Sequence, residues 1–114
     1  MNNLDRARLV DMLHYAELAI SFTGSHEPAA LEKDERTFLA TCKAIEIVGE
    51  AASQVSSAGR EELPHLPWRE AIAMRHRLVH GYQSVVAEVI VGTVRGSLPP
   101  LINSLRRVLA DNPE

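Results

Sequence analysis

The sequence has few aromatic residues. One Trp, two Tyr and two Phe together make up 4% of the chain. A core with so few large rings must be built from Leu, Ile, Val and Ala, a composition typical of helices packed closely on helices. No segment alternates β-branched or aromatic residues with polar ones, which argues against a sheet. The content of 46% hydrophobic and 24% charged residues is that of a globular chain.

The sequence also has little cysteine and no long apolar run. Cys42 stands alone, so an intrachain disulfide is excluded, and its apolar stripe indicates a small core residue rather than a nucleophile. No apolar run approaches the roughly 20 residues of a membrane-spanning helix. The N-terminal MNNLDRARLV does not have the basic-then-apolar pattern of a signal segment. We therefore expect a cytoplasmic protein with no membrane partner.

There is no excess of positive charge either. The net charge of −3 gives no general attraction to nucleic acid, so any contact with a polyanion must be local. A chain of 114 residues is too short for two ordinary cores. We expect one domain over residues 1–114.

The apolar residues recur at helical spacing. This periodicity predicts an N-terminal helix capped by Asn3, a loop over 57–67, and a bend or restart at Pro99-Pro100. Gly49, in the middle of a helix, predicts a close helix–helix crossing. The resulting fold class is all-α, an up-and-down bundle of four to five helices. The predicted helices span 4–22, 29–57, 67–80 and 85–111.

One stretch, WREAIAMRHRLVHGY at 68–82, does not fit a simple packing pattern. Read as a helix, it places Arg75 on an otherwise apolar seam, although an unpaired buried guanidinium is costly. Gly81 predicts the helix end, with His80 in the last turn. The seam consists of Trp68, Ile72, Arg75, Val79 and Tyr82. Three explanations remain open at this point: pairing with a buried carboxylate, a subunit interface, or a site that binds an anion.

Each explanation has its own chemistry. A structural reading pairs Arg75 with Glu50 or Glu46. A phosphate-binding reading suits RNA cleavage, because histidine can move protons near neutral pH and arginine can bind phosphate oxygens in a bidentate way. One histidine cannot easily serve both sides of a phosphate, so a symmetric dimer with two copies of Arg75 and His80 across one cleft would be needed. His76 and His80 have the spacing of metal ligands, but no carboxylate or cysteine completes a set, so neither metal nor cofactor is expected.

The same residues carry a family resemblance. Arg75-x4-His80-Gly81-Tyr82 resembles the Arg-x4-6-His-x-Tyr motif of HEPN ribonucleases. The wider pattern resembles the HepT toxin family over residues 38–110. The matching blocks are IVGEAA at 47–52, LPWREAIAMRHRLVHGY at 66–82 and the later LP at 98–99.

The resemblance implies a HEPN-like helical homodimer with a metal-independent RNA-cleaving site at the dimer cleft. By motif, Arg75 and His80 are the catalytic pair, and His76 and Arg77 support the site or orient substrate. The family also implies an MNT-type nucleotidyltransferase antitoxin that transfers AMP to the motif tyrosine, here Tyr82, and so blocks RNA.

Two positions depart from the family pattern. Val86 stands where members often carry an acidic residue, and Val91 where they often carry a tryptophan. The leading hypothesis is a toxin endoribonuclease of a type VII-like toxin–antitoxin pair. The alternative, which Val86 and the low positive charge favour, is a non-catalytic helical dimer that binds a nucleotidyltransferase and is modified by it.

Overall fold

The chain folds into α-helices joined by short connections, and the computed structural model describes residues 1–76 and 83–114. Within these residues there is no β-strand, so the predicted all-α class is confirmed. The elements are α1 (Asn3–Thr23), α2 (Pro28–Lys33), α3 (Glu35–Gln54), α4 (Ser57–Glu62), α5 (Trp68–Ala73), α6 (Gln83–Gly92), a π-helical turn η1 (Thr93–Ser97) and α7 (Leu98–Asp111).

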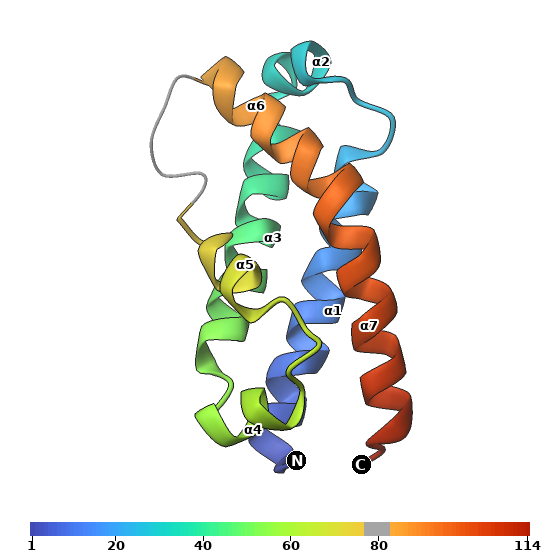
Figure 1. The fold of residues 1–114 in the computed structure, drawn as a ribbon. Coiled ribbons are helices and arrows are strands. Elements are labelled where there is room, and N and C mark those ends of the chain that lie inside the picture. The colour runs from blue at the N-terminus through green and yellow to red at the C-terminus, as the bar shows by residue number, and fades with distance from the viewer. Residues whose placement is uncertain (77–82) are drawn as a thin grey trace.

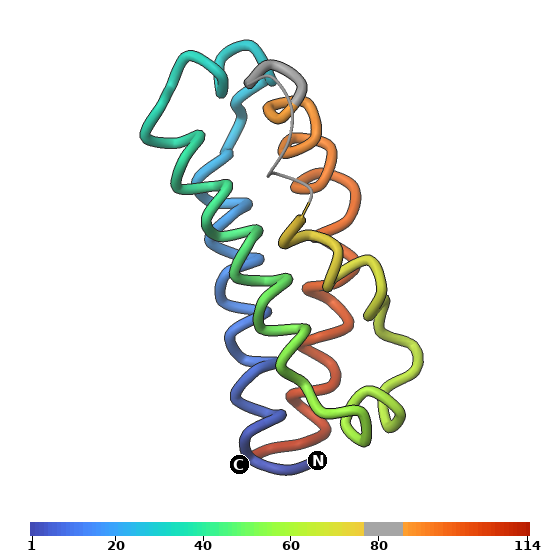
Figure 2. The backbone as a smooth tube through the Cα atoms, turned by 90° about the vertical axis from the view of Figure 1, so that its left-hand side faces the viewer, coloured from blue at the N-terminus to red at the C-terminus, as the bar shows by residue number. Residues whose placement is uncertain are grey.

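Three long rods make the body of the bundle. Helix α1 packs against both α3 and α7 and runs antiparallel to each (Figure 1). Figure 2, turned by 90°, shows the two chain ends side by side at one end of the bundle. There, Arg6 Nε donates to the Asn112 carbonyl at 2.8 Å. Farther along the same pair of antiparallel helices, Arg106 lies 3.2 Å from Glu17.

The first helix is capped differently from the prediction. The side chain of Asn2, rather than Asn3, accepts the Asp5 backbone N–H at 2.7 Å, and Gly24 ends the helix with a φ of +52°. Its buried face includes a carboxylate. The buried residues are Asp5, Leu9, Met12, Ala16, Ala19 and Thr23.

The predicted helix over 29–57 is two helices. The chain breaks at Asp34, whose carboxylate caps α3 by accepting the Thr37 backbone N–H at 3.2 Å and the Thr37 hydroxyl at 2.8 Å. An aspartate can hold a helix N-terminus in this way because the first backbone N–H groups have no partner inside the helix. The break lets α2 pack on α6 while α3 continues along α1.

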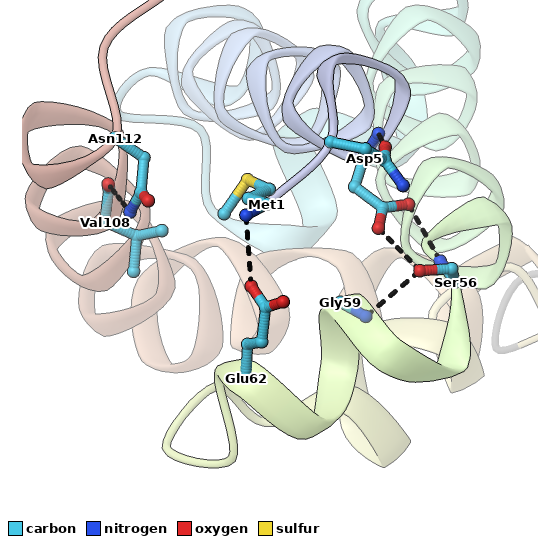
Figure 3. A network of polar contacts seen from close by, with 8 residues as sticks. Met1, Asp5, Ser56, Gly59, Glu62, Val108 and Asn112 are labelled. Carbon is cyan, nitrogen blue, oxygen red and sulfur yellow. Dashed lines mark hydrogen bonds and ion pairs between the residues drawn. The ribbon is translucent and has the colours of Figure 1, made fainter.

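The predicted loop over 57–67 contains a short helix, α4, held by a buried carboxylate (Figure 3). Asp5 accepts the Ser56 backbone N–H at 2.9 Å and the Ser56 hydroxyl at 2.6 Å, and that hydroxyl accepts the Gly59 N–H at 3.0 Å. The N-terminal ammonium of Met1 lies 3.3 Å from Glu62. These contacts fasten the start of α1 to α4 across a sequence distance that no local pattern reveals.

Asp5 remains charged despite its burial. Burial raises the pKa of its carboxyl, but hydrogen bonds from the Ser56 hydroxyl and backbone N–H, together with the N-terminal ammonium, outweigh burial and leave this pKa below its ordinary value. The carboxylate therefore stabilises the fold in its ionised form.

The last helical rod restarts as predicted near the two prolines. The π-helical turn η1 follows α6, and α7 begins at Leu98 with Pro99 in its first turn, where the missing N–H costs nothing. Arg95 on this turn reaches Glu27 at 2.9 Å and so ties η1 to the start of α2. None of the described helices is long and apolar enough to cross a membrane.

Candidate active site

Helix α5 brings Arg75 to the side of α3. The core-facing residues of this segment are Ala71 and Met74, both almost fully buried, whereas Trp68 and Ile72 are half-buried. The Trp68 indole N–H donates to the Leu63 carbonyl at 2.8 Å. The predicted apolar seam is therefore the edge of the packed face rather than its centre.

The predicted helix over 67–80 does not continue to His76 as an α-helix. Residues 74–76 form a turn with tightened bonds, from Met74 N–H to Ala71 O at 3.2 Å and from His76 N–H to Ala73 O at 3.0 Å. This turn places Arg75 at the rim of the packed face, where its side chain is 33% exposed. Its charge is thus hydrated, and the cost of a fully buried guanidinium does not arise.

Gly49 in the middle of α3 receives the backbone of Arg75. A Cβ on Gly49 would lie 2.5 Å from Arg75 N, 2.9 Å from its Cβ and 3.1 Å from its Cα. No side chain fits there unless the backbone moves. The close crossing predicted from the mid-helix glycine is confirmed, and its partner is the turn that carries Arg75.

The guanidinium of Arg75 has two neighbours among the described residues. Its Nε–H donates to His76 Nε2 at 3.0 Å, and one terminal nitrogen lies 3.6 Å from a carboxylate oxygen of Glu50. The bond to His76 needs the lone pair on Nε2, so it forms with the neutral ring. Of the three explanations left open by the sequence, pairing with a carboxylate is the one seen in the structure. The carboxylate is that of Glu50, which is 53% exposed rather than buried.

The remaining residues proposed for the site lie outside the part of the chain that the structure describes. They are Arg77, His80 and Tyr82, together with Gly81 at the predicted helix end. Glu46, the second carboxylate considered for Arg75, pairs instead with Lys43 at 3.6 Å.

Val86 and Val91, the two departures from the family pattern, are buried. Both belong to the hydrophobic cluster that runs through the bundle, so on α6 they serve packing.

The structure also has a hollow that the sequence did not reveal. It has a volume of about 660 Å³ and is walled by the loop before α5 and by α5 itself. Its lining residues are Pro64, Leu66, Pro67, Trp68, Arg69, Glu70 and Ala73. Within residues 1–76 and 83–114, no three His, Cys, Asp or Glu side chains gather closely enough to hold a metal ion.

Fold and site together define a class of protein. It is an all-helical bundle in which an arginine and a histidine, here Arg75 and His76, lie side by side at the edge of the packed face. The chain belongs to the HepT-like ribonuclease family. The family model described as "Ribonuclease HepT-like" matches residues 12–108, which cover all the elements from the middle of α1 to most of α7.

Individual relatives also have ribonuclease names. The chain is 27% identical to "Putative RNase MJ1216" of Methanocaldococcus jannaschii over 93% of this chain and 88% of that protein. It is 37% identical to "Probable ribonuclease HepT" of Thermococcus cleftensis over 60% of this chain and 62% of that protein. It is 31% identical to "Putative RNase TTE0752" of Caldanaerobacter subterraneus over 68% and 69% of the two chains. No solved structure matches the chain.

Proposed function

We propose that this protein is a metal-independent endoribonuclease and the toxin of a type VII-like toxin–antitoxin pair. Membership of the HepT-like ribonuclease family supports RNA cleavage in general. The motif Arg75-x4-His80-x-Tyr82 supports the particular site. In this mechanism His80 transfers protons to and from the reacting oxygens, and Arg75 stabilises charge on the transferring phosphate.

The observation that carries this proposal is the setting of Arg75. A guanidinium with one-third of its side chain exposed, beside a histidine and next to a tightly packed glycine, is accessible to a phosphate yet restricted in position. Arginine suits this task because its planar fork can contact two non-bridging oxygens at once.

The proposed enzyme acts as a homodimer. Cleavage needs a base for the 2′-hydroxyl and an acid for the leaving 5′-oxygen, on opposite sides of one phosphate. Two copies of His80 in a shared cleft would supply both, with two copies of Arg75 for the charge. His76 and Arg77 would orient the substrate or the catalytic arginine.

The proposed control of this enzyme is modification of Tyr82 by an MNT-type nucleotidyltransferase antitoxin. Transfer of AMP from ATP to the phenolic oxygen, with release of pyrophosphate and of the phenolic proton, would add bulk and negative charge beside the site, and both would repel RNA. Intact-mass spectrometry of the protein, incubated with that partner and ATP, should show the added adenylyl group. The Tyr82→Phe variant should remain unmodified.

The ribonuclease is tested directly by cleavage of RNA in the presence of EDTA. The wild-type protein should cleave, and Arg75→Ala and His80→Ala should each abolish cleavage while the helical content and the dimer persist. Equal cleavage by the wild-type protein and both variants would contradict the assigned site.

A second candidate function is a non-catalytic helical dimer whose role is to be bound and modified by the nucleotidyltransferase. The burial of Val86, at a position where family members often carry an acidic residue, favours this alternative because it removes a polar support. A protein that leaves RNA intact but still accepts AMP on Tyr82 would establish it.

A further inference from the structure

From the contacts of Arg75 we infer that residues 49–50 of α3 position this arginine for phosphate binding. Gly49 lets the Arg75 backbone pack directly against α3, and Glu50 orients the Arg75 guanidinium. Neither residue needs to touch the RNA, so both are positioning residues rather than catalytic ones. The inference rests on the proposed ribonuclease function and assigns part of its site to a helix outside the Arg-x4-His-x-Tyr segment.

The contact at Gly49 is unusually close and cannot be relieved by a side-chain rotation. The atoms nearest to a hypothetical Gly49 Cβ, at 2.5 Å and 3.1 Å, are Arg75 N and Cα, which belong to the backbone. At Gly92, by contrast, an added Cβ would meet nothing within 4 Å. Gly49 therefore fixes the distance between α3 and the turn, and with it the point from which the Arg75 side chain extends.

The contact at Glu50 controls a different degree of freedom. Its carboxylate lies 3.6 Å from a terminal nitrogen of Arg75, whereas His76 accepts from Nε on another edge of the same plane. Two anchors on different nitrogens restrict rotation of the guanidinium plane. A bidentate contact with phosphate depends on the orientation of that plane.

Stability alone does not account for this ion pair. Glu50 is 53% exposed and Arg75 33%, and pairs with such exposure contribute little to folding. A carboxylate beside a phosphate-binding arginine also repels the incoming phosphate. The two effects of Glu50 have opposite consequences, because orientation raises the rate of the chemical step, whereas repulsion weakens RNA binding.

Kinetics of the Glu50→Ala variant decide between these effects. If Glu50 positions Arg75, kcat for cleavage of a short RNA should fall about tenfold or more, since small displacements of a catalytic group cost up to about 10²-fold. KM should stay within about twofold of the wild-type value. Glu46→Ala is the matched control, because Glu46 lies one turn earlier on α3, is 50% exposed and pairs with Lys43. It should leave kcat and KM unchanged.

Two further variants separate positioning from loss of fold. Glu50→Asp keeps the charge but shortens the side chain and should show a smaller loss of kcat than Glu50→Ala. Gly49→Ala should lower kcat strongly, whereas Gly92→Ala should not. The double variant Glu50→Ala/Arg75→Ala should be no slower than Arg75→Ala, since Glu50 acts through Arg75. Circular dichroism and thermal unfolding establish that each variant is folded.

A readout independent of cleavage is the set of Nη–H resonances of Arg75 in ¹H–¹⁵N spectra at low temperature, because Glu50 contacts a terminal nitrogen. These resonances, assigned by their loss in Arg75→Ala, should be resolved in the wild-type protein and in Glu46→Ala, and averaged or broadened in Glu50→Ala. This measurement reports on orientation even in a protein that does not cleave RNA.

The outcomes distinguish the two proposals. An inactive wild-type protein contradicts the ribonuclease function itself, whereas full activity of Arg75→Ala contradicts the assignment of the site to Arg75. An active wild-type protein with inactive Arg75→Ala, but with Glu50→Ala equal to Glu46→Ala, overturns only the role of Glu50. A fall in KM with unchanged kcat in Glu50→Ala also overturns it, because that result identifies the carboxylate as a source of repulsion alone.

Discussion

At the scale of single residues, the guanidinium of Arg75 stays in contact with water because the turn at 74–76 places it at the rim of the packed face. The sequence marks this arginine as anomalous, since it interrupts an apolar seam. The local pattern does not show how the structure accommodates Arg75, because the turn that carries it packs against Gly49, far away in the chain. A mid-helix glycine predicts a close approach, but only the fold identifies the residue that approaches.

The single cysteine gives a prediction at this scale. Burial, together with the nearby carboxylate of Glu46, raises the pKa of the Cys42 thiol to about 11. At about pH 8 roughly one thiol in a thousand is then ionised, and the thiolate is the reactive form. Iodoacetamide should label folded protein far more slowly than urea-unfolded protein, as followed by mass spectrometry. Equal labelling rates would contradict the interpretation of Cys42 as a packing residue.

At the scale of elements, the long helices were predictable, but the break at Asp34 and the short helix α4 were not. The break at Asp34 depends on a side-chain cap that competes with continuation of the helix, and the run around it contains no glycine or proline. Helix α4 depends on Asp5, whose bonds to Ser56 span 51 positions. Apolar periodicity does not report contacts of either kind.

The junction between α1 and α4 predicts a pH-dependent stability. Asp5→Asn removes a charged acceptor of two hydrogen bonds and should lower the free energy of unfolding near neutral pH by about 1.5–3 kcal/mol. Because the folded pKa of Asp5 is below its unfolded value of about 3.9, the stabilisation is complete above that value and is lost as pH falls through the folded pKa.

Urea unfolding of the wild-type protein and Asp5→Asn at neutral and acid pH measures this effect. The difference between the two proteins should narrow as the pH falls below about 4. A difference that stays constant down to about pH 3 would assign the loss to altered packing rather than to the charge of Asp5.

Gly59 gives a second prediction at the same junction. A Cβ there would meet the Asp5 carboxylate and would lie 3.1 Å from Val55 Cγ1. Gly59→Ala should therefore lower the free energy of unfolding by about 1–3 kcal/mol through overpacking. Gly92→Ala is the control, because Gly92 has helical dihedral angles of −60° and −43° and open space around it. That variant should be neutral or more stable, and a loss of the same size at Gly92 would contradict the explanation.

At the scale of the whole molecule, the chain forms a bundle of 42 × 24 × 20 Å with both termini at one end. Composition and periodicity predicted the all-α class, since few aromatics and many aliphatic residues favour packing of helix on helix. For the site, the motif predicted a set of residues, of which the structure describes Arg75 and His76. The contact between Arg75 and Gly49 of α3 was only partly predictable, because no local pattern in the sequence connects these two segments.

The proposed cleft adds a prediction at this scale. If two copies of Arg75 and His80 share one phosphate, the protein must be a dimer at working concentrations. Sedimentation equilibrium at micromolar concentration should give twice the mass of the chain, and Arg75→Ala should leave this mass unchanged. A monomer would remove the second copy of each catalytic group and contradict the mechanism.

The measurement that tests the central claim most directly is single-turnover cleavage of RNA in EDTA by the wild-type protein, Arg75→Ala and Arg69→Ala. Arg69 is the matched control, since it carries the same charge, lies on α5 directly before the turn that holds Arg75, and is exposed. We predict cleavage by the wild-type protein and by Arg69→Ala, and a loss of at least about 10²-fold in Arg75→Ala, as expected when a group that stabilises transition-state charge is removed. Equal rates in the two arginine variants would contradict the assignment of the active site to Arg75.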